Sequence, residues 1–98
     1  MFGSVFRVKV KPGSYDKLQE VIASWNRDRA PKAVGTQGSY ALHSKDDPNE
    51  MWVMAIFDTE ENYYKNANDP DQDAWFQKMR ANLESDPEWH DGEITKTM

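Results

Sequence analysis

Hydrophobic and polar residues alternate over the first ten positions of the chain. The residues of one face are mostly apolar, and those of the other are mostly small or charged. The first face carries Phe2, Ser4, Phe6, Val8 and Val10. A period of two residues predicts a strand over residues 2–11 with one buried face.

A helix is expected next. Pro12-Gly13 favours a turn, Ser14 is a suitable N-cap, and Pro31 closes the segment. Between these residues an apolar stripe recurs at helical spacing, at Leu18, Val21, Ile22 and Trp25. The stripe predicts a helix over about residues 14–30 with one face against a core.

Two further strands are expected in the middle of the chain. Residues 35–44 have the pattern of a strand, in which Gly38 indicates a β-bulge, and turn-forming residues 46–49 follow it. Residues 51–57 are apolar at every position, which is typical of a strand buried on both faces. Because one layer of helices covers only one face of a sheet, this strand predicts a partner subunit on the other face.

The second half of the chain repeats the helix and strand signals. Thr59 is suited to cap a short helix that ends near residue 68, and Asp69 followed by Pro70 starts another. The second of these helices is expected to reach about Ser85, with an apolar side made of Trp75, Phe76, Met79 and Leu83. Residues 88–98 are expected to form a last edge strand.

The order β-α-β-β-α-β, with its second helix split, predicts one α+β domain over residues 1–98. The expected fold is ferredoxin-like, with a four-stranded antiparallel sheet and helices on one face. A chain of 98 residues is the size of one domain and has little core material, so a partner subunit would add stability.

Composition narrows the function classes. The net charge is -5 and the basic residues are scattered, which argues against nucleic-acid binding. The absence of cysteine excludes disulfides, thiol nucleophiles and cysteine-ligated metals. We see no signal peptide, and the longest apolar run, residues 51–57, is far shorter than the roughly 20 residues that cross a bilayer. We therefore expect a soluble, cytoplasmic protein that binds no membrane.

The sequence offers no metal or cofactor motif. Asp69, Asp71 and Asp73 resemble the start of a calcium loop, but Ala74 and Arg80 stand where that loop needs Gly and Glu. Nucleotide-binding and nucleophile motifs are absent as well. We therefore predict no metal and no cofactor.

Two side chains are candidates for catalysis. His43 is expected on an internal strand, and an imidazole titrates close to neutral pH, so His43 is the candidate base. Tyr40 is the candidate hydrogen-bond donor beside it. Residues three apart on a regular strand point to opposite faces, so the pair can share a site only if the bulge at Gly38 turns them together. His90 is expected at the surface.

The aromatic content of 12%, with four tryptophans, is high for this length. These side chains either fill the core or line an apolar pocket between helices and sheet. On the second interpretation the pocket is lined by Phe6, Trp25, Phe57, Trp75, Phe76 and Met79.

Several short motifs, taken in order, resemble the antibiotic biosynthesis monooxygenase family of the dimeric α/β-barrel superfamily. They are Lys11-Pro12-Gly13, Gly35 followed by Tyr40-Ala41-Leu42-His43, Asp47-Pro48-Asn49-Glu50, Ile56-Phe57-Asp58-Thr59-Glu60 and Trp75-Phe76. The resemblance covers residues 5–95. It implies a homodimer of stacked sheets with one pocket in each subunit. It further implies a cofactor-independent monooxygenase of small aromatic or quinol-like molecules.

The chain departs from the family pattern at several positions. Phe6 stands where haem-degrading members carry Asn, and residues 74–83 contain no haem-ligating His. Phe57 replaces a family tryptophan, and Trp75-Phe76 replaces a frequent His-Phe pair. Haem degradation is therefore disfavoured. Two alternatives to the oxygenase are a non-catalytic ligand-binding dimer and a structural barrel whose pocket is filled by Trp25 and Trp75.

Overall fold

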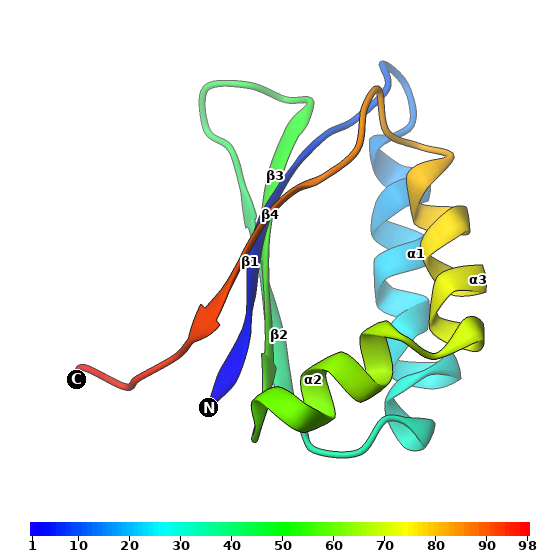
Figure 1. Ribbon diagram of the computed structural model, residues 1–98. Helices are drawn as coiled ribbons and strands as arrows, with labels where there is room; N and C mark the ends of the chain where they lie inside the picture. Colours follow the sequence, from blue (N-terminus) through cyan, green and yellow to red (C-terminus); the bar gives the residue numbers. More distant parts are fainter.

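The computed structural model describes residues 1–98, which form one four-stranded antiparallel sheet with helices on one side (Figure 1). The strands lie in the order β2-β3-β1-β4. In chain order the elements are β1 (Phe2–Lys9), α1 (Tyr15–Asp28), the 3₁₀ turn η1 (Ala30–Lys32), β2 (Thr36–His43), β3 (Glu50–Phe57), α2 (Glu60–Ala67), α3 (Pro70–Arg80) and β4 (Glu88–Glu93). The ferredoxin-like α+β arrangement is therefore confirmed.

The core lies between the two central strands and the helices. Val8 of β1 pairs with Met51 of β3, and both side chains are almost fully buried. Leu18 of α1 and Met79 of α3 cover them from the helical side. Each side chain of this size stabilises the fold by roughly 1.5–3 kcal/mol on burial, so this cluster fixes the helices to the sheet.

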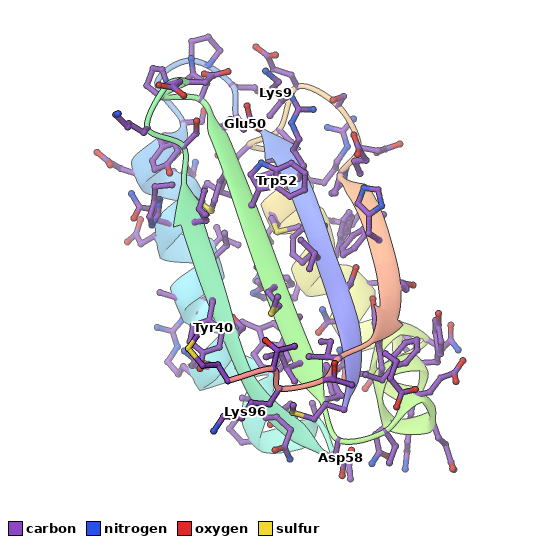
Figure 2. The ribbon with its side chains drawn as sticks, turned by 90° about the vertical axis from the view of Figure 1, so that its left-hand side faces the viewer. Lys9, Tyr40, Glu50, Trp52, Asp58 and Lys96 are labelled. Carbon is purple, nitrogen blue, oxygen red and sulfur yellow. The ribbon has the colours of Figure 1, made fainter.

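Strand β3 is apolar on both faces, as its sequence predicted. Met51, Val53 and Phe57 are buried toward the helices. Trp52 and Met54 project from the opposite side, which we call the back face of the sheet. Figure 2 looks onto this face and shows Trp52 and Tyr40 on it, with the helices behind. No helix covers the back face; the chain after β4 crosses it at one end, near Tyr40 (Figure 2).

The β-bulge expected at Gly38 is present. Pairing between β2 and β3 passes from Thr36 directly to Gly38, which leaves Gln37 as the extra residue. Gly38 has a φ of 131°, a conformation that side chains disfavour. From Gly38 to His43 the pairing is regular, so successive side chains alternate between the two faces.

All three helices start where the sequence predicted, and two of the three predicted N-cap side chains make a capping hydrogen bond. Thr59 caps α2 by accepting a hydrogen bond from the Asn62 amide, and Asp69 caps α3 by accepting one from the Asp71 amide. Ser14 occupies the N-cap position of α1, but its side chain makes no capping bond.

Two elements end earlier than predicted. Helix α3 ends at Arg80 instead of Ser85, because the next residues pair with the end of β1: the Glu84 amide donates to the Lys9 carbonyl at 2.9 Å. Strand β4 ends at Glu93 instead of residue 98. The chain then leaves the sheet on the side opposite the helices (Figure 1).

Candidate functional site

A cavity of about 420 Å³ lies between the sheet and the helical layer. Of its 24 lining residues, 15 are hydrophobic, and they come from all three helices and all four strands. This volume and this mainly apolar wall are those of a small-molecule site. We call this space the cavity.

All six side chains expected to line a pocket lie in the wall of this cavity: Phe6, Trp25, Phe57, Trp75, Phe76 and Met79. The two tryptophans are half-buried and tied to the helices. The Trp25 indole donates to Gln72 Oε1 at 2.9 Å, and the Trp75 indole donates to Ser24 Oγ at 3.2 Å. Because both rings are held in the wall, the space beside them stays open. The interpretation of a pocket filled by these tryptophans is therefore wrong.

One end of the cavity is polar, and we call Ser4, Tyr63, Tyr64 and Asp91 its polar end. The Tyr63 and Tyr64 hydroxyls each donate to one oxygen of the Asp91 carboxylate, both at 3.1 Å. The two rings stack with their centroids 4.9 Å apart. Helix α2 thus presents two neighbouring phenols to one carboxylate of β4.

Ser4 lies directly across the sheet from Asp91, in register on the adjacent strand β1. It is 1% exposed, it lines the cavity, and its hydroxyl makes no well-formed hydrogen bond, although it lies close enough to the Tyr63 hydroxyl to act on the pKa of that group. Burial without a partner is costly for a hydroxyl, so this atom is available to a molecule in the cavity.

The charged side chains that line the cavity are all acidic. Its wall includes the carboxylates of Asp73 and Asp91 but no Lys, Arg or His. Burial raises the pKa of Tyr63 well above its usual value, the Asp91 carboxylate adds to the rise, and the nearby Ser4 hydroxyl opposes it. Tyr63 therefore keeps its proton near neutral pH and remains a donor to Asp91.

Trp89 of β4 is an exposed aromatic side chain in the wall of the cavity. Its side chain is 46% exposed and packs against Phe6, with ring centroids 4.4 Å apart, and against Phe76 at 5.9 Å. The three rings of Phe6, Phe76 and Trp89 form a continuous aromatic surface in this part of the wall.

Buried Arg29 holds the walls of the cavity together. Its guanidinium donates to Gln72 at 3.1 Å, to Asn66 at 3.0 Å and to Asp69 at 3.1 Å. These bonds join the end of α1 to the junction of α2 and α3. The Asp71 amide and the Arg29 guanidinium hold the pKa of Asp69 below its usual value.

The known proteins that resemble this chain do so in structure. Neither the models of protein families nor the curated protein sequences match it. SnoaB, a cofactor-independent oxygenase from Streptomyces nogalater, has a TM-score of 0.85 at 18% identity, over 99% of this chain and 95% of SnoaB. Another structure, of an antibiotic biosynthesis monooxygenase, has a TM-score of 0.78 at 8% identity, over 98% of this chain and 100% of that one.

A protein of unknown function from Nitrosomonas europaea has a TM-score of 0.78 at 23% identity, over 99% of this chain and 91% of that one. The chain has the fold of the antibiotic biosynthesis monooxygenases. At these identities the likeness concerns the fold, and the site residues have to be argued from this structure.

The two residues proposed for catalysis from the sequence do not meet. Tyr40 pairs with Met54 on the back face and is 70% exposed, whereas His43 pairs with Met51 on the helical side. The bulge precedes both residues, so the regular alternation between them is kept. His43 contacts the Tyr15 hydroxyl, and neither His43 nor Tyr40 lines the cavity. The predicted pairing of Tyr40 with His43 is therefore corrected.

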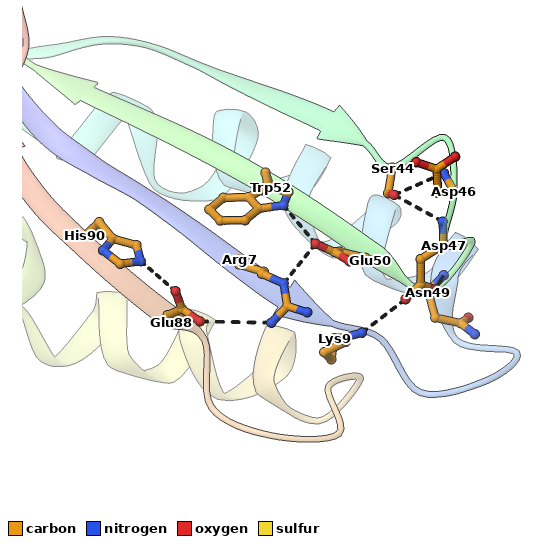
Figure 3. Close-up of polar contacts among 10 residues, drawn as sticks. All are labelled: Arg7, Lys9, Ser44, Asp46, Asp47, Asn49, Glu50, Trp52, Glu88 and His90. Atoms are coloured by element: carbon orange, nitrogen blue, oxygen red, sulfur yellow. Dashed lines mark hydrogen bonds and ion pairs between the residues drawn. The ribbon is translucent and has the colours of Figure 1, made fainter.

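The back face carries a polar network beside its apolar part (Figure 3). Arg7 donates to Glu50 at 2.8 Å, and the Trp52 indole donates to the same oxygen at 2.9 Å. These two bonds lower the pKa of Glu50 below its usual value. Exposed His90 lies 2.8 Å from Glu88 on the same face, as expected for a surface histidine.

Two negative findings complete the description. No group of three or more His, Asp or Glu side chains is placed to hold a metal ion. None of the helices combines the length and the apolar character that crossing a membrane requires.

Proposed function

We propose that this protein is a cofactor-independent monooxygenase of small aromatic molecules of the phenol or quinol class. The observation that carries the proposal is the cavity: an aromatic chamber of about 420 Å³ with one carboxylate-bearing polar end. The fold shared with SnoaB, itself a cofactor-independent oxygenase, supports the reaction type.

A quinol is able to supply all the electrons for this reaction. One hydroquinone and one O₂ give one hydroxyquinone and one water. The ring loses four electrons, and one oxygen atom enters a ring C–H bond. The other oxygen takes the two phenolic hydrogens and leaves as water. No external reductant is consumed, so the protein has only to bind, orient and activate the ring.

Asp91 is our candidate for activating the substrate. Two phenols fix its carboxylate, and it stays able to accept a further hydrogen bond at the edge of the cavity. A substrate hydroxyl that donates to this carboxylate gains electron density on its ring, which favours reaction with O₂. In this proposal Tyr63 and Tyr64 are positioning residues, since they act through Asp91.

A homodimer is part of the proposal. The back face offers an apolar groove formed by Val5, Tyr40, Leu42, Trp52 and their neighbours on β2 and β3. Tyr40 and Leu42 are 70% and 61% exposed in the single chain. A second copy that stacks on this face would bury them.

Oxygen uptake tests the proposed reaction. The protein should accelerate O₂ consumption by naphthohydroquinones above their spontaneous oxidation. Asp91→Asn should lower the protein-dependent rate by about tenfold or more. His43→Ala is the control and should stay within about twofold, since His43 lies outside the cavity. Acceleration that survives in Asp91→Asn but is lost in His43→Ala would contradict the assignment.

The second candidate is a ligand-binding protein without catalysis. It is favoured by one observation: no histidine lines the cavity, so no group with an imidazole's affinity for protons meets the ligand. Aromatic binding without any protein-dependent O₂ uptake would select this alternative.

A further inference from the structure

The polar end of the cavity is rich in acceptors and poor in free donors. The only hydroxyl protons of Tyr63 and Tyr64 are directed at Asp91, and the carboxylate itself only accepts. A molecule that reaches this end must therefore bring a proton of its own to donate.

Ser4 is the one residue of the polar end with a hydroxyl proton that is not directed at Asp91. It is also an independent indication that a ligand binds here. Its hydroxyl is buried, lines the cavity, and makes no well-formed hydrogen bond within the protein, although the Tyr63 hydroxyl lies near it. A hydroxyl both donates and accepts, so Ser4 is able to complete the pairing of a ligand group that has already donated to Asp91. Ala55 lies across from Ser4 on β3, and Phe57 is two positions further along, which leaves an apolar surface for a ring beside it.

Charge restricts the ligand further. No cationic side chain lines the cavity, whereas Asp73 and Asp91 do. An aromatic carboxylate or phosphate would enter a low-dielectric space with like charges and no counterion, and it would have no proton for Asp91.

We infer that Ser4 and Asp91 form a hydroxyl-recognition site, which selects uncharged hydroxyl-bearing aromatics and rejects aromatic carboxylates. The inference deepens the proposed function, on which it rests for the aromatic nature of the ligand. Ser4 is then a specificity-determining residue at the buried limit of the cavity. The hydroxyl of the ligand donates to Asp91 and accepts from Ser4.

Equilibrium dialysis under nitrogen tests this inference without turnover. The probes share one ring system: 2-naphthol, naphthalene, 2-naphthoate and 2-naphthylmethylammonium. Wild-type protein should bind 2-naphthol about tenfold more tightly than naphthalene or 2-naphthoate, the size of effect expected for one or two hydrogen bonds in a closed site. The ammonium probe should bind more weakly than 2-naphthol, because an ammonium cannot accept a hydrogen bond from Ser4 and its charge loses hydration in the closed site.

Ser4→Ala should reduce the preference for 2-naphthol over naphthalene to about twofold and leave naphthalene binding within about twofold. This variant removes an unpartnered hydroxyl, so it should fold at least as well as the wild type, which urea unfolding will verify. Ser39→Ala is the matched control. It removes a hydroxyl from the same wall two strands away, roughly 10 Å, and should preserve the preference.

Three outcomes would overturn the inference: an unchanged preference in Ser4→Ala, equal binding of 2-naphthoate, or tighter binding of the ammonium probe. The outcomes also separate this inference from the proposed function. A hydroxyl preference without O₂ uptake contradicts the oxygenase only. Uptake without the preference contradicts the recognition site only.

Discussion

Tyr63 is a half-buried phenol whose pKa the folded structure raises. Burial raises its pKa above the ordinary 10.0, and its hydroxyl donates to Asp91. The folded protein thus holds this proton more firmly than the unfolded chain does. Above about pH 10 the unfolded state ionises first, so folding loses stability as the pH rises.

The loss of stability at high pH can be tested with a variant of Tyr63. The free energy of unfolding should fall between about pH 9 and 11, and it should fall less steeply in Tyr63→Phe, which has no proton to lose there. Urea unfolding at a series of pH values measures both slopes. Equal slopes in the two proteins would mean that Tyr63 is not the buried phenol described here.

Single residues also show what the sequence could reveal about the site. The six side chains expected to line a pocket were predicted from the high aromatic content of the chain, and all six lie in the wall of the cavity. Ser4 had a visible signal, since it interrupts an otherwise apolar face between Phe2 and Phe6. Asp91 had none, because its position depends on the pairing of β4 with β1 and on the crossing of α2 near their ends. His43 drew attention through its chemistry, and its position was not fixed by any pattern.

At the scale of elements, the junction of α2 and α3 depends on Arg29. Its guanidinium is buried and donates to three side chains from that junction. Removing it leaves polar groups without a donor in a closed space, which is costly.

Arg29→Met should therefore lower the free energy of unfolding by about 2–3 kcal/mol. Arg27→Met is the control: its side chain is 76% exposed and pairs only with Asp28, so the change should stay within about 0.5 kcal/mol. Chemical denaturation compares the two. Equal effects would show that the Arg29 bonds do not hold the helices.

The boundaries of some helices and strands could be predicted from local sequence signals, and those of others could not. Strand β3 and the starts of α2 and α3 follow from local signals, namely an unbroken apolar run and two capping side chains. The end of α3 could not be read locally. Leu83 continues the helical stripe in sequence, but its backbone pairs with Val10 instead. At this position the local pattern favours a helix, whereas the bridge to Val10 depends on a contact between residues far apart in the sequence. The end of α3 therefore follows from the tertiary structure.

For the molecule as a whole, we propose that a second copy covers the exposed back face. If a second copy stacks on it, sedimentation at micromolar concentration should give about 23 kDa, twice the chain mass of 11.4 kDa. Leu42→Lys places a charge within the apolar groove and should shift the protein toward the monomer. Val34→Lys, at an equally exposed site away from this groove, should not. A wild-type monomer at that concentration would contradict the dimer.

We propose that the molecule inserts one atom of O₂ into an aromatic ring with electrons from that ring. Turnover of a naphthohydroquinone under ¹⁸O₂ is the decisive test of this reaction. We expect one labelled oxygen in each hydroxyquinone, one O₂ consumed per product, and no hydrogen peroxide, at a rate that Asp91→Asn lowers. An unlabelled quinone with stoichiometric peroxide, or product formed no faster than without protein, would contradict it.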